Sequence, residues 1–131
     1  MTYIPTIVFV CEHGAAKSIV AATYFNKLAS EKGLNIKAVA RGTHPDQELS
    51  QKTINGLLED GLTPLESTPA KLLATDLETA QQIITFCELP AEVRLKVPVE
   101  QWDDTPPVSE NYQTARDAIL EHLTRLIAEL N

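Results

Sequence analysis

The sequence predicts an α/β protein built on a parallel sheet that helices cover on both faces. Short apolar segments rich in β-branched residues alternate with segments that have helical periodicity. This alternation favours a parallel sheet, because each crossover between two parallel strands places a helix on one of its faces. The chain has 131 residues and no linker or low-complexity tract. We therefore expect a single domain over residues 1–131.

Four segments have the composition of strands. Ile7-Val8-Phe9-Val10 is continuously apolar, which is typical of a strand buried on both faces. The same reading predicts strands at Ile36–Ala40, Gln82–Cys87 and Leu95–Val99. Pro98 weakens the last of these, which suits an edge strand or the end of a strand.

Two helices are expected in the first half of the chain. Helix formers dominate Lys17–Lys32, and Gly33 stands where a C-cap glycine would. Ser50 is a candidate N-cap for a second helix that ends before Gly61. That helix would turn three apolar side chains inward: Ile54, Leu57 and Leu58.

Two more helices are expected in the second half. Thr75-Asp76-Leu77-Glu78 has the spacing of a capping box and predicts the start of a short helix. Near the end of the chain, apolar residues recur at intervals of three and four and form one stripe. The stripe consists of Tyr112, Ala115, Ile119, Leu123, Leu126 and Leu130, which makes Tyr112 a packing residue.

Composition excludes several classes of protein. The formal net charge is −7, whereas a general nucleic-acid binder carries a basic stripe. The sequence has no apolar run of about 18 residues that would span a membrane, and its N-terminus lacks the basic segment of a signal peptide. Two cysteines make neither a disulfide framework nor a thiolate zinc site. We expect a cytoplasmic enzyme or binding module without a metal or cofactor.

The polar segment after the first strand is the candidate functional site, because ligands of parallel sheets bind beyond the carboxyl ends of the strands. Such a turn points backbone N–H groups into one concavity, and the helix N-terminus adds about half a positive charge. We therefore expect a tetrahedral oxyanion such as phosphate or arsenate to bind here. The segment reads Cys11-Glu12-His13-Gly14-Ala15-Ala16-Lys17-Ser18.

Cys11 is the candidate nucleophile of this loop. Lys17 and the Ser18 hydroxyl would favour its thiolate form, and Gly14 suits a curve that needs a positive φ. A cysteine at the end of a buried strand is also often only a small hydrophobe. A nucleotide-hydrolase phosphate loop is excluded, because Cys11 and Ala16 stand where that motif needs glycines.

The sequence resembles the low-molecular-weight protein tyrosine phosphatases and the thioredoxin-coupled arsenate reductases. Those families carry the motif C-x-x-N-x-x-R-S between the first strand and the first helix, and Cys11, Lys17 and Ser18 stand at the matching positions. The resemblance extends from Ile7 to Leu130. Three other segments are similar to family motifs. Ala40-Arg41-Gly42-Thr43 is similar to the family's Ser-Ala-Gly-Thr, and Ile84-Thr85-Phe86-Cys87 is similar to the strand that carries a second redox cysteine in the reductases. Trp102 and Pro106-Pro107 are similar to the late W-x-x-x-D-P loop. The resemblance implies a four-stranded parallel sheet flanked by helices. It also implies a reaction intermediate on Cys11, either a phosphocysteine or an arsenocysteine.

Three positions depart from the family motifs. The family arginine is Lys17, a point charge in place of a planar fork, and the asparagine that braces the loop is Gly14. The aspartate that acts as general acid falls on Pro106, which donates no proton. Asp103 and Asp104 lie close in sequence, and we favour Asp104 as the acid, the alternative being that both are solvated loop carboxylates.

The departures leave three functions open. The first is a phosphatase that acts on a small phosphoester or a phosphorylated protein through Cys11. The second is an arsenate reductase in which Cys87 or an external thiol reductant resolves Cys11. Cys87 is otherwise a core residue, and the third cysteine of the thioredoxin-coupled reductases is missing. The third is an impaired member that binds phosphate or a phosphoprotein without turnover.

The remaining polar residues near the loop carry weaker expectations. Glu12 would oppose a dianion if it pointed inward, so we expect it to point outward or to bind a cation. His13 would tune the thiolate or contact the substrate, and His44 would line the same rim. His122 is expected on the surface of the last helix. The spacing of the three histidines predicts no metal site.

Overall fold

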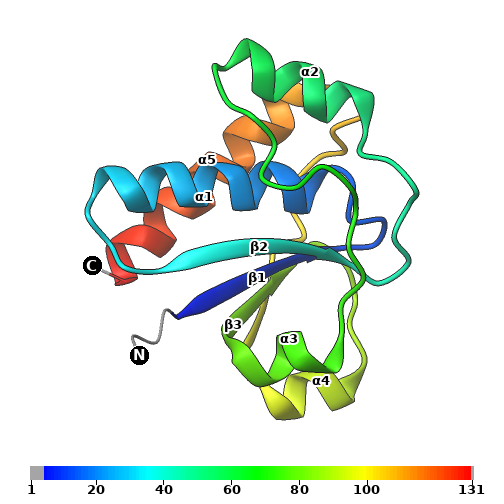
Figure 1. Ribbon diagram of the computed structural model, residues 1–131, viewed down its shortest axis with the longest axis vertical. Helices are drawn as coiled ribbons and strands as arrows, with labels where there is room; N and C mark the ends of the chain where they lie inside the picture. Colours follow the sequence, from blue (N-terminus) through cyan, green and yellow to red (C-terminus); the bar gives the residue numbers. More distant parts are fainter. Residues whose placement is uncertain (1–4, 131) are drawn as a thin grey trace.

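The protein forms a four-stranded parallel sheet with helices on both faces (Figure 1). The computed structural model describes residues 5–130. The sheet comprises β1 (Thr6–Cys11), β2 (Lys37–Gly42), β3 (Ala80–Thr85) and β4 (Val99–Gln101), in the order β2-β1-β3-β4. All three pairings are parallel, which confirms the predicted fold class.

The helices divide unequally between the two faces. One side holds α1 (Lys17–Glu31), α2 (Gln51–Glu59) and α5 (Tyr112–Leu130), and the other holds α3 (Ala74–Thr79) and α4 (Ala91–Lys96) (Figure 1). The stripe predicted for the last helix faces the larger core. No helix within residues 5–130 is long and apolar enough to cross a membrane.

Strand β1 is buried along its whole length and serves both cores. Ile7 and Phe9 pack into the core beneath α1 and α5, while Val8 and Val10 pack on the opposite face with Ile83. Successive strand residues point to opposite faces, so a strand between two cores must be apolar throughout. Cys11 is the last residue of β1 and lies at the carboxyl edge of the sheet.

Strand β2 lies at an edge of the sheet, and side chains satisfy much of its outer backbone. Asn26 of α1 exchanges two hydrogen bonds with Ala38, of 2.8 and 3.0 Å. The Glu66 carboxylate accepts a hydrogen bond of 2.9 Å from the Ala40 N–H. Covering the edge in this way blocks pairing with another chain and holds β2 in place.

The predicted boundaries of α1 and α2 are close to the observed ones. Gly33 follows α1 with a φ of +69°, as expected of a C-cap glycine. The Ser50 hydroxyl accepts a hydrogen bond of 3.4 Å from Thr53 N–H at the start of α2. Leu57 is buried as predicted, but Leu58 is 55% exposed, so its predicted inward orientation was wrong. Helix α2 therefore packs on the core through Leu57 and the partly buried Ile54, and Leu58 takes no part in this contact.

The capping box was placed two residues too late. Helix α3 begins after Leu73, whose N–H donates a 2.9 Å hydrogen bond to the Asp76 carboxylate. Thr75 instead lies in the first turn, and its carbonyl accepts a hydrogen bond of 3.1 Å from the Thr79 hydroxyl. Asp76 fills the acidic position of the box because it stands three residues after the true N-cap.

The third and fourth strands differ from the prediction. Residues 91–96 form α4, in which Leu95 is 86% exposed, and β4 begins only at Val99. Pro90 precedes this helix, where its fixed φ is compatible with a helix start. Pro98 contributes only a carbonyl, which accepts a 2.9 Å hydrogen bond from Ile83. Strand β3 ends at Thr85, so Cys87 lies in the bend beyond it rather than on the strand.

Candidate active site

Cys11 and Ser18 form a buried pair at the end of β1. The Cys11 Sγ lies 3.0 Å from the Ser18 Oγ, and the Ser18 side chain is fully buried. Cys11 ends the central strand, and Ser18 is the second residue of α1, so the turn between them brings the two side chains together. A hydroxyl at this distance is able to donate to a thiolate and stabilise its charge.

The segment after β2 holds the loop by its backbone carbonyls. Four carbonyls of the loop accept hydrogen bonds from backbone N–H groups of residues 43–50, which we call the strap. The bonds run to Cys11 from Thr43 (3.3 Å), to Glu12 from His44 (2.7 Å), to His13 from Asp46 (3.0 Å) and to Ala15 from Ser50 (3.0 Å). The N–H groups of residues 12–16 donate to no acceptor within residues 5–130. They remain available to an anion.

The start of α1 adds positive potential to the loop. Ala16 is the N-cap and makes no side-chain capping hydrogen bond, which leaves the N–H groups of the first turn unsatisfied by a cap. Lys17 is half-buried and has no ion-pair partner within the described residues. The helix dipole and this ammonium therefore both favour an anion beside Cys11.

Gly14 provides the curvature of the loop, as predicted. Its φ of +62° lies in the left-handed region, which glycine adopts without strain. Gly14 lies directly against Gly42 at the end of β2, a contact that the sequence did not indicate because the two residues are far apart along the chain. The loop and the end of β2 thus meet backbone to backbone.

An open pocket of about 350 Å³ lies over the loop. Its lining includes most of the predicted oxyanion-binding residues together with residues from three other segments. The lining residues are Cys11, Glu12, His13, Ala15, Ala16, Lys17, Asp46, Ser50, Phe86, Cys87, Pro107, Val108 and Ser109. Sequence reasoning missed Asp46, Ser50, Val108 and Ser109, which are brought to the pocket only by folding.

Cys87 lines the same pocket as Cys11. Its Sγ lies 3.4 Å from the Thr85 hydroxyl, and its N–H donates a 3.1 Å hydrogen bond to the same oxygen. Burial raises the pKa of the Cys87 thiol, and the nearby Cys11 and Glu12 act in the same direction. Cys87 is therefore held mainly as a neutral thiol at neutral pH, half-buried at the wall of the pocket.

The rim of the pocket is acidic. Glu12 and Asp46 are 63% and 53% exposed, and His13 lies 3.2 Å from Asp46 and 3.8 Å from Glu12. Glu12 is exposed while it lines the pocket, and His13 lies close to both carboxylates of the rim. His44 is exposed, with its Nδ1 3.3 Å from the Thr43 hydroxyl. No group of three or more acidic, histidine or cysteine residues within residues 5–130 is arranged to hold a metal.

Asp104 is bound to helix α5 rather than to the pocket. Its carboxylate lies 2.7 Å from His122 Nε2, and this hydrogen bond is the main reason that its pKa is lowered. His122 is not a free surface residue, since it stacks on Trp102 with ring centroids 4.5 Å apart and planes at 12°. The pocket's described lining does not include Asp104. Trp102 is buried against Phe9 and Phe86.

Tyr112 packs as predicted, but its hydroxyl belongs to a polar cluster that the sequence did not indicate. Asp60 Oδ2 accepts hydrogen bonds from Tyr24 (2.6 Å) and Tyr112 (2.9 Å), and Oδ1 pairs with Arg116 at 2.9 Å. Burial alone would raise the pKa of Asp60, but these three donors outweigh it and lower the pKa. The cluster joins α1, α2 and α5 behind the loop.

The fold and the loop define a class of α/β proteins in which a cysteine ends the first strand and a tight turn leads from it to the first helix. Residues 6–103 match the family described as low molecular weight phosphotyrosine protein phosphatase. The chain belongs to this family.

Its relatives include both phosphatases and arsenate reductases. A candidate arsenate reductase of Halobacterium salinarum is 25% identical over 132 residues, covering 94% of this chain and 91% of the relative. The structure of YfkJ from Bacillus subtilis aligns with a TM-score of 0.84 at 19% identity, over 98% of this chain and 96% of the other. That of an arsenate reductase from Archaeoglobus fulgidus aligns with a TM-score of 0.71 at 24% identity, over 95% and 98%. These structural alignments establish the shared fold.

Proposed function

We propose that the protein binds a phosphate ester in the loop after β1 and transfers its phosphoryl group to Cys11. The observation that carries the proposal is the 3.0 Å Cys11–Ser18 pair beneath a loop whose N–H groups donate to no acceptor in the described part of the chain. The thiolate attacks phosphorus, the P–O bond to the leaving group breaks, and the leaving group takes a proton. Water then hydrolyses the S–P bond, which releases phosphate and regenerates Cys11.

The pocket favours substrates with a good leaving group. Its described lining contains only two carboxyl groups, those of Glu12 and Asp46, and both lie on the exposed rim. Asp104 is engaged by His122. An aryl phosphate releases an acidic phenol, which needs less help from a general acid than an alkyl alcohol does. A small aryl phosphoester or a phosphorylated tyrosine side chain fits this requirement.

Arsenate reduction is the second candidate, and the position of Cys87 in the same pocket favours it. Arsenate would condense with the Cys11 thiol and release water. Attack of Cys87 on the Cys11 sulfur would then form a disulfide and release arsenite, so two thiols supply the two electrons. An external thiol would reduce the disulfide. The candidate arsenate reductase of Halobacterium salinarum supports this alternative.

Binding without turnover is the third candidate. Lys17 offers one point charge where an arginine would hold two equatorial oxygens, and Pro106 removes the acid. Loss of contacts that act mainly in the transition state lowers turnover by orders of magnitude and leaves ground-state binding intact.

Three assays on one set of variants separate these functions. The wild-type protein, Cys11→Ser and Ser18→Ala are tested for hydrolysis of p-nitrophenyl phosphate, for arsenate-dependent oxidation of dithiothreitol, and for the rise of Tm with phosphate. Ser30→Ala, an exposed position on the same helix, is the matched control. Hydrolysis lost in Cys11→Ser and reduced in Ser18→Ala supports the phosphatase, and arsenate-dependent thiol oxidation supports the reductase. A rise of Tm alone supports binding without turnover.

A further inference from the structure

Gly14 and Gly42 make a contact that leaves no room for a side chain on either residue. A Cβ built on Gly42 would lie 2.7 Å from the Gly14 nitrogen and 2.9 Å from its Cα. A Cβ built on Gly14 would lie 2.9 Å from the Gly42 nitrogen. Because every close atom is backbone, no side chain is able to rotate away and relieve the overlap. The pairing of Cys11 with Gly42 in the sheet places this contact directly beside the candidate nucleophile.

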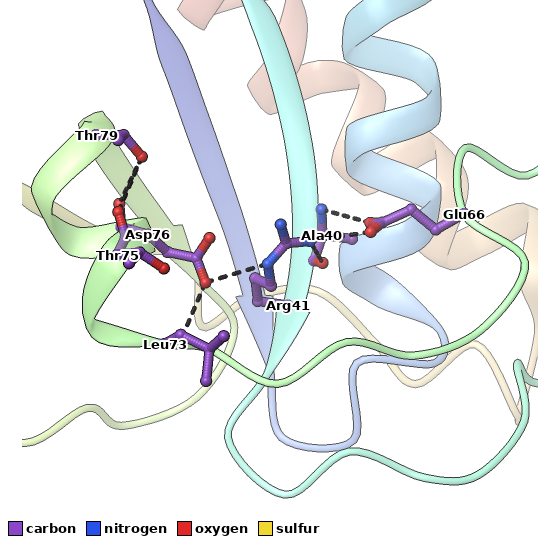
Figure 2. Close-up of polar contacts among 7 residues, drawn as sticks. All are labelled: Ala40, Arg41, Glu66, Leu73, Thr75, Asp76 and Thr79. Carbon is purple, nitrogen blue, oxygen red and sulfur yellow. Dashed lines mark hydrogen bonds and ion pairs between the residues drawn. The ribbon is translucent and has the colours of Figure 1, made fainter.

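The opposite side of Gly42 is also held. Its N–H donates a 2.8 Å hydrogen bond to the Ala70 carbonyl, and its own carbonyl accepts a 3.0 Å bond from Leu72. The preceding residue, Arg41, bridges Glu66 at 2.9 Å and Asp76 at 3.2 Å, as Figure 2 shows. The end of β2 is thus anchored to the segment after α2 and to α3. An added Cβ on Gly42 would push against the loop, because the hydrogen bonds to Ala70 and Leu72 hold the Gly42 backbone in place.

The strap orients the loop through planar peptides. In a trans peptide the C=O of one residue and the N–H of the next point in opposite directions. The loop carbonyls of Cys11, Glu12, His13 and Ala15 point at the strap. The N–H group of the residue after each of these carbonyls therefore points away from the strap. These N–H groups belong to Glu12, His13, Gly14 and Ala16. The strap hydrogen bonds set the direction of the donors that would meet an oxyanion.

We propose that Gly42 is a positioning residue that holds the oxyanion loop through backbone contact with Gly14. This role rests on the proposed binding of an oxyanion at the loop. Gly14 has no side chain with which to brace the loop. Here the backbone of β2 supports the loop directly, and the strap that continues from Gly42 orients the N–H donors before an anion arrives.

The proposal is tested with Gly42→Ala and Gly14→Ala, with Gly33→Ala as the matched control. Gly33 has a φ of +69° and no atom within 4 Å of a built Cβ, so alanine there strains the backbone at the far end of α1 and leaves the loop untouched. The dissociation constant of inorganic phosphate is measured by its protection of Cys11 from iodoacetamide, and Tm is measured on the same samples. Mass spectrometry of the Cys11 peptide separates its reaction from that of Cys87.

We expect both loop-contact variants to weaken phosphate binding about tenfold or more, because misdirected N–H groups lose hydrogen bonds to a charged ligand. Gly33→Ala should lower Tm and change phosphate binding less than about twofold, which separates positioning from stability. If Gly42→Ala binds phosphate as the wild type does, the positioning role is wrong and the proposed function stands. If phosphate gives the wild type no protection, the oxyanion site is absent and both proposals fail.

A measurement on the unmodified protein tests the same role should the variants fail to fold. Hydrogen exchange at the strap N–H groups of Thr43, His44, Asp46 and Ser50 is recorded with and without phosphate. We expect these amides to be protected in both conditions, since the strap holds the loop in advance of binding. Protection that develops only with phosphate would show that the anion, and not β2, shapes the loop.

Discussion

Asp104 lies 2.7 Å from His122 Nε2, and His122 in turn lies flat on the Trp102 ring. This contact ties the segment after β4 to the middle of α5. It involves the carboxyl group that stood closest in sequence to the missing general acid. The carboxylate nearest in sequence to that position is instead a hydrogen-bonding partner of His122 on the last helix.

Substitution of Asp104 by Asn should therefore affect stability rather than chemistry. Hydrolysis of phenyl phosphate, whose phenol is far less acidic than p-nitrophenol and so depends more on a general acid, should stay within about twofold of the wild type in Asp104→Asn, because loss of a true general acid costs about 100-fold or more. The hydrogen bond from His122 lowers the pKa of Asp104, so its contribution to stability is present above the unfolded pKa and is lost as pH falls through the folded value. The acid side of the Tm–pH curve should flatten in Asp104→Asn. Asp103→Asn, with an exposed carboxyl nearby, serves as the control, and a large loss of turnover would assign Asp104 the acid role after all.

Lys17→Arg should strengthen the oxyanion site. A guanidinium in this half-buried position would contact two equatorial oxygens at once. We expect phosphate to bind about tenfold more tightly, and turnover of an aryl phosphate to rise by at least as much. Both are measured beside Lys27→Arg, a substitution on the same helix at a residue paired with Glu31. Unchanged or weaker phosphate binding would mean that the ammonium of Lys17 does not face the anion.

The acidic rim should select for positive charge in molecules that reach Cys11. Glu12 and Asp46 are exposed carboxylates at the mouth of the pocket. Cys11 is treated with a cationic and an anionic methanethiosulfonate reagent, and the ratio of the two rates is compared between wild type and the Glu12→Gln, Asp46→Asn double variant. We expect the cation preference to fall about two- to fivefold, as screened surface charges allow. Glu48→Gln is the control, since Glu48 is exposed and does not line the pocket. An unchanged ratio would contradict a charge effect at the rim.

The Asp60 cluster should govern how stability depends on pH. Tyr112→Phe removes one donor to Asp60 and should cost about 1 kcal/mol in the free energy of unfolding. Because the folded pKa of Asp60 is lowered, its contribution is present above an unfolded pKa of about 4 and is lost as pH falls through the folded value.

Burial and Asp60 raise the pKa of Tyr24 to about 12, so stability should also fall as pH rises from about 10 to 12.

Urea unfolding of Tyr112→Phe from pH 2 to pH 7 measures the acid limb. Asp117→Asn is the matched control, because Asp117 also pairs with Arg116 but is 67% exposed. The acid limb should be shallower in Tyr112→Phe and unchanged in Asp117→Asn. Identical limbs in Tyr112→Phe and wild type would show that the tyrosine does not set the pKa of Asp60.

Local patterns predicted the elements that have strong local signals. The apolar run at Ile7–Val10, the glycine at position 33 and the periodic stripe of α5 each carry their own signal, and each lies where the sequence placed it. The helix at residues 91–96 was not predicted, and a strand was expected at Leu95–Val99 instead. A short segment with alternating polarity is compatible with a strand and with a helix. Its single leucine, Leu95, ended up exposed, so burial did not decide between the two.

The sequence by itself determined the order of the elements other than α4, and the loop that joins Cys11 to Ser18, because both depend on residues that are near neighbours along the chain. The tertiary structure decided what surrounds that loop. It brought Cys87 and Asp46 to the pocket, drew Asp104 away to His122, and set Gly42 against Gly14. These contacts join residues that are distant in sequence and depend on how β2 and α5 pack, and packing of that kind leaves no pattern in a local stretch of chain.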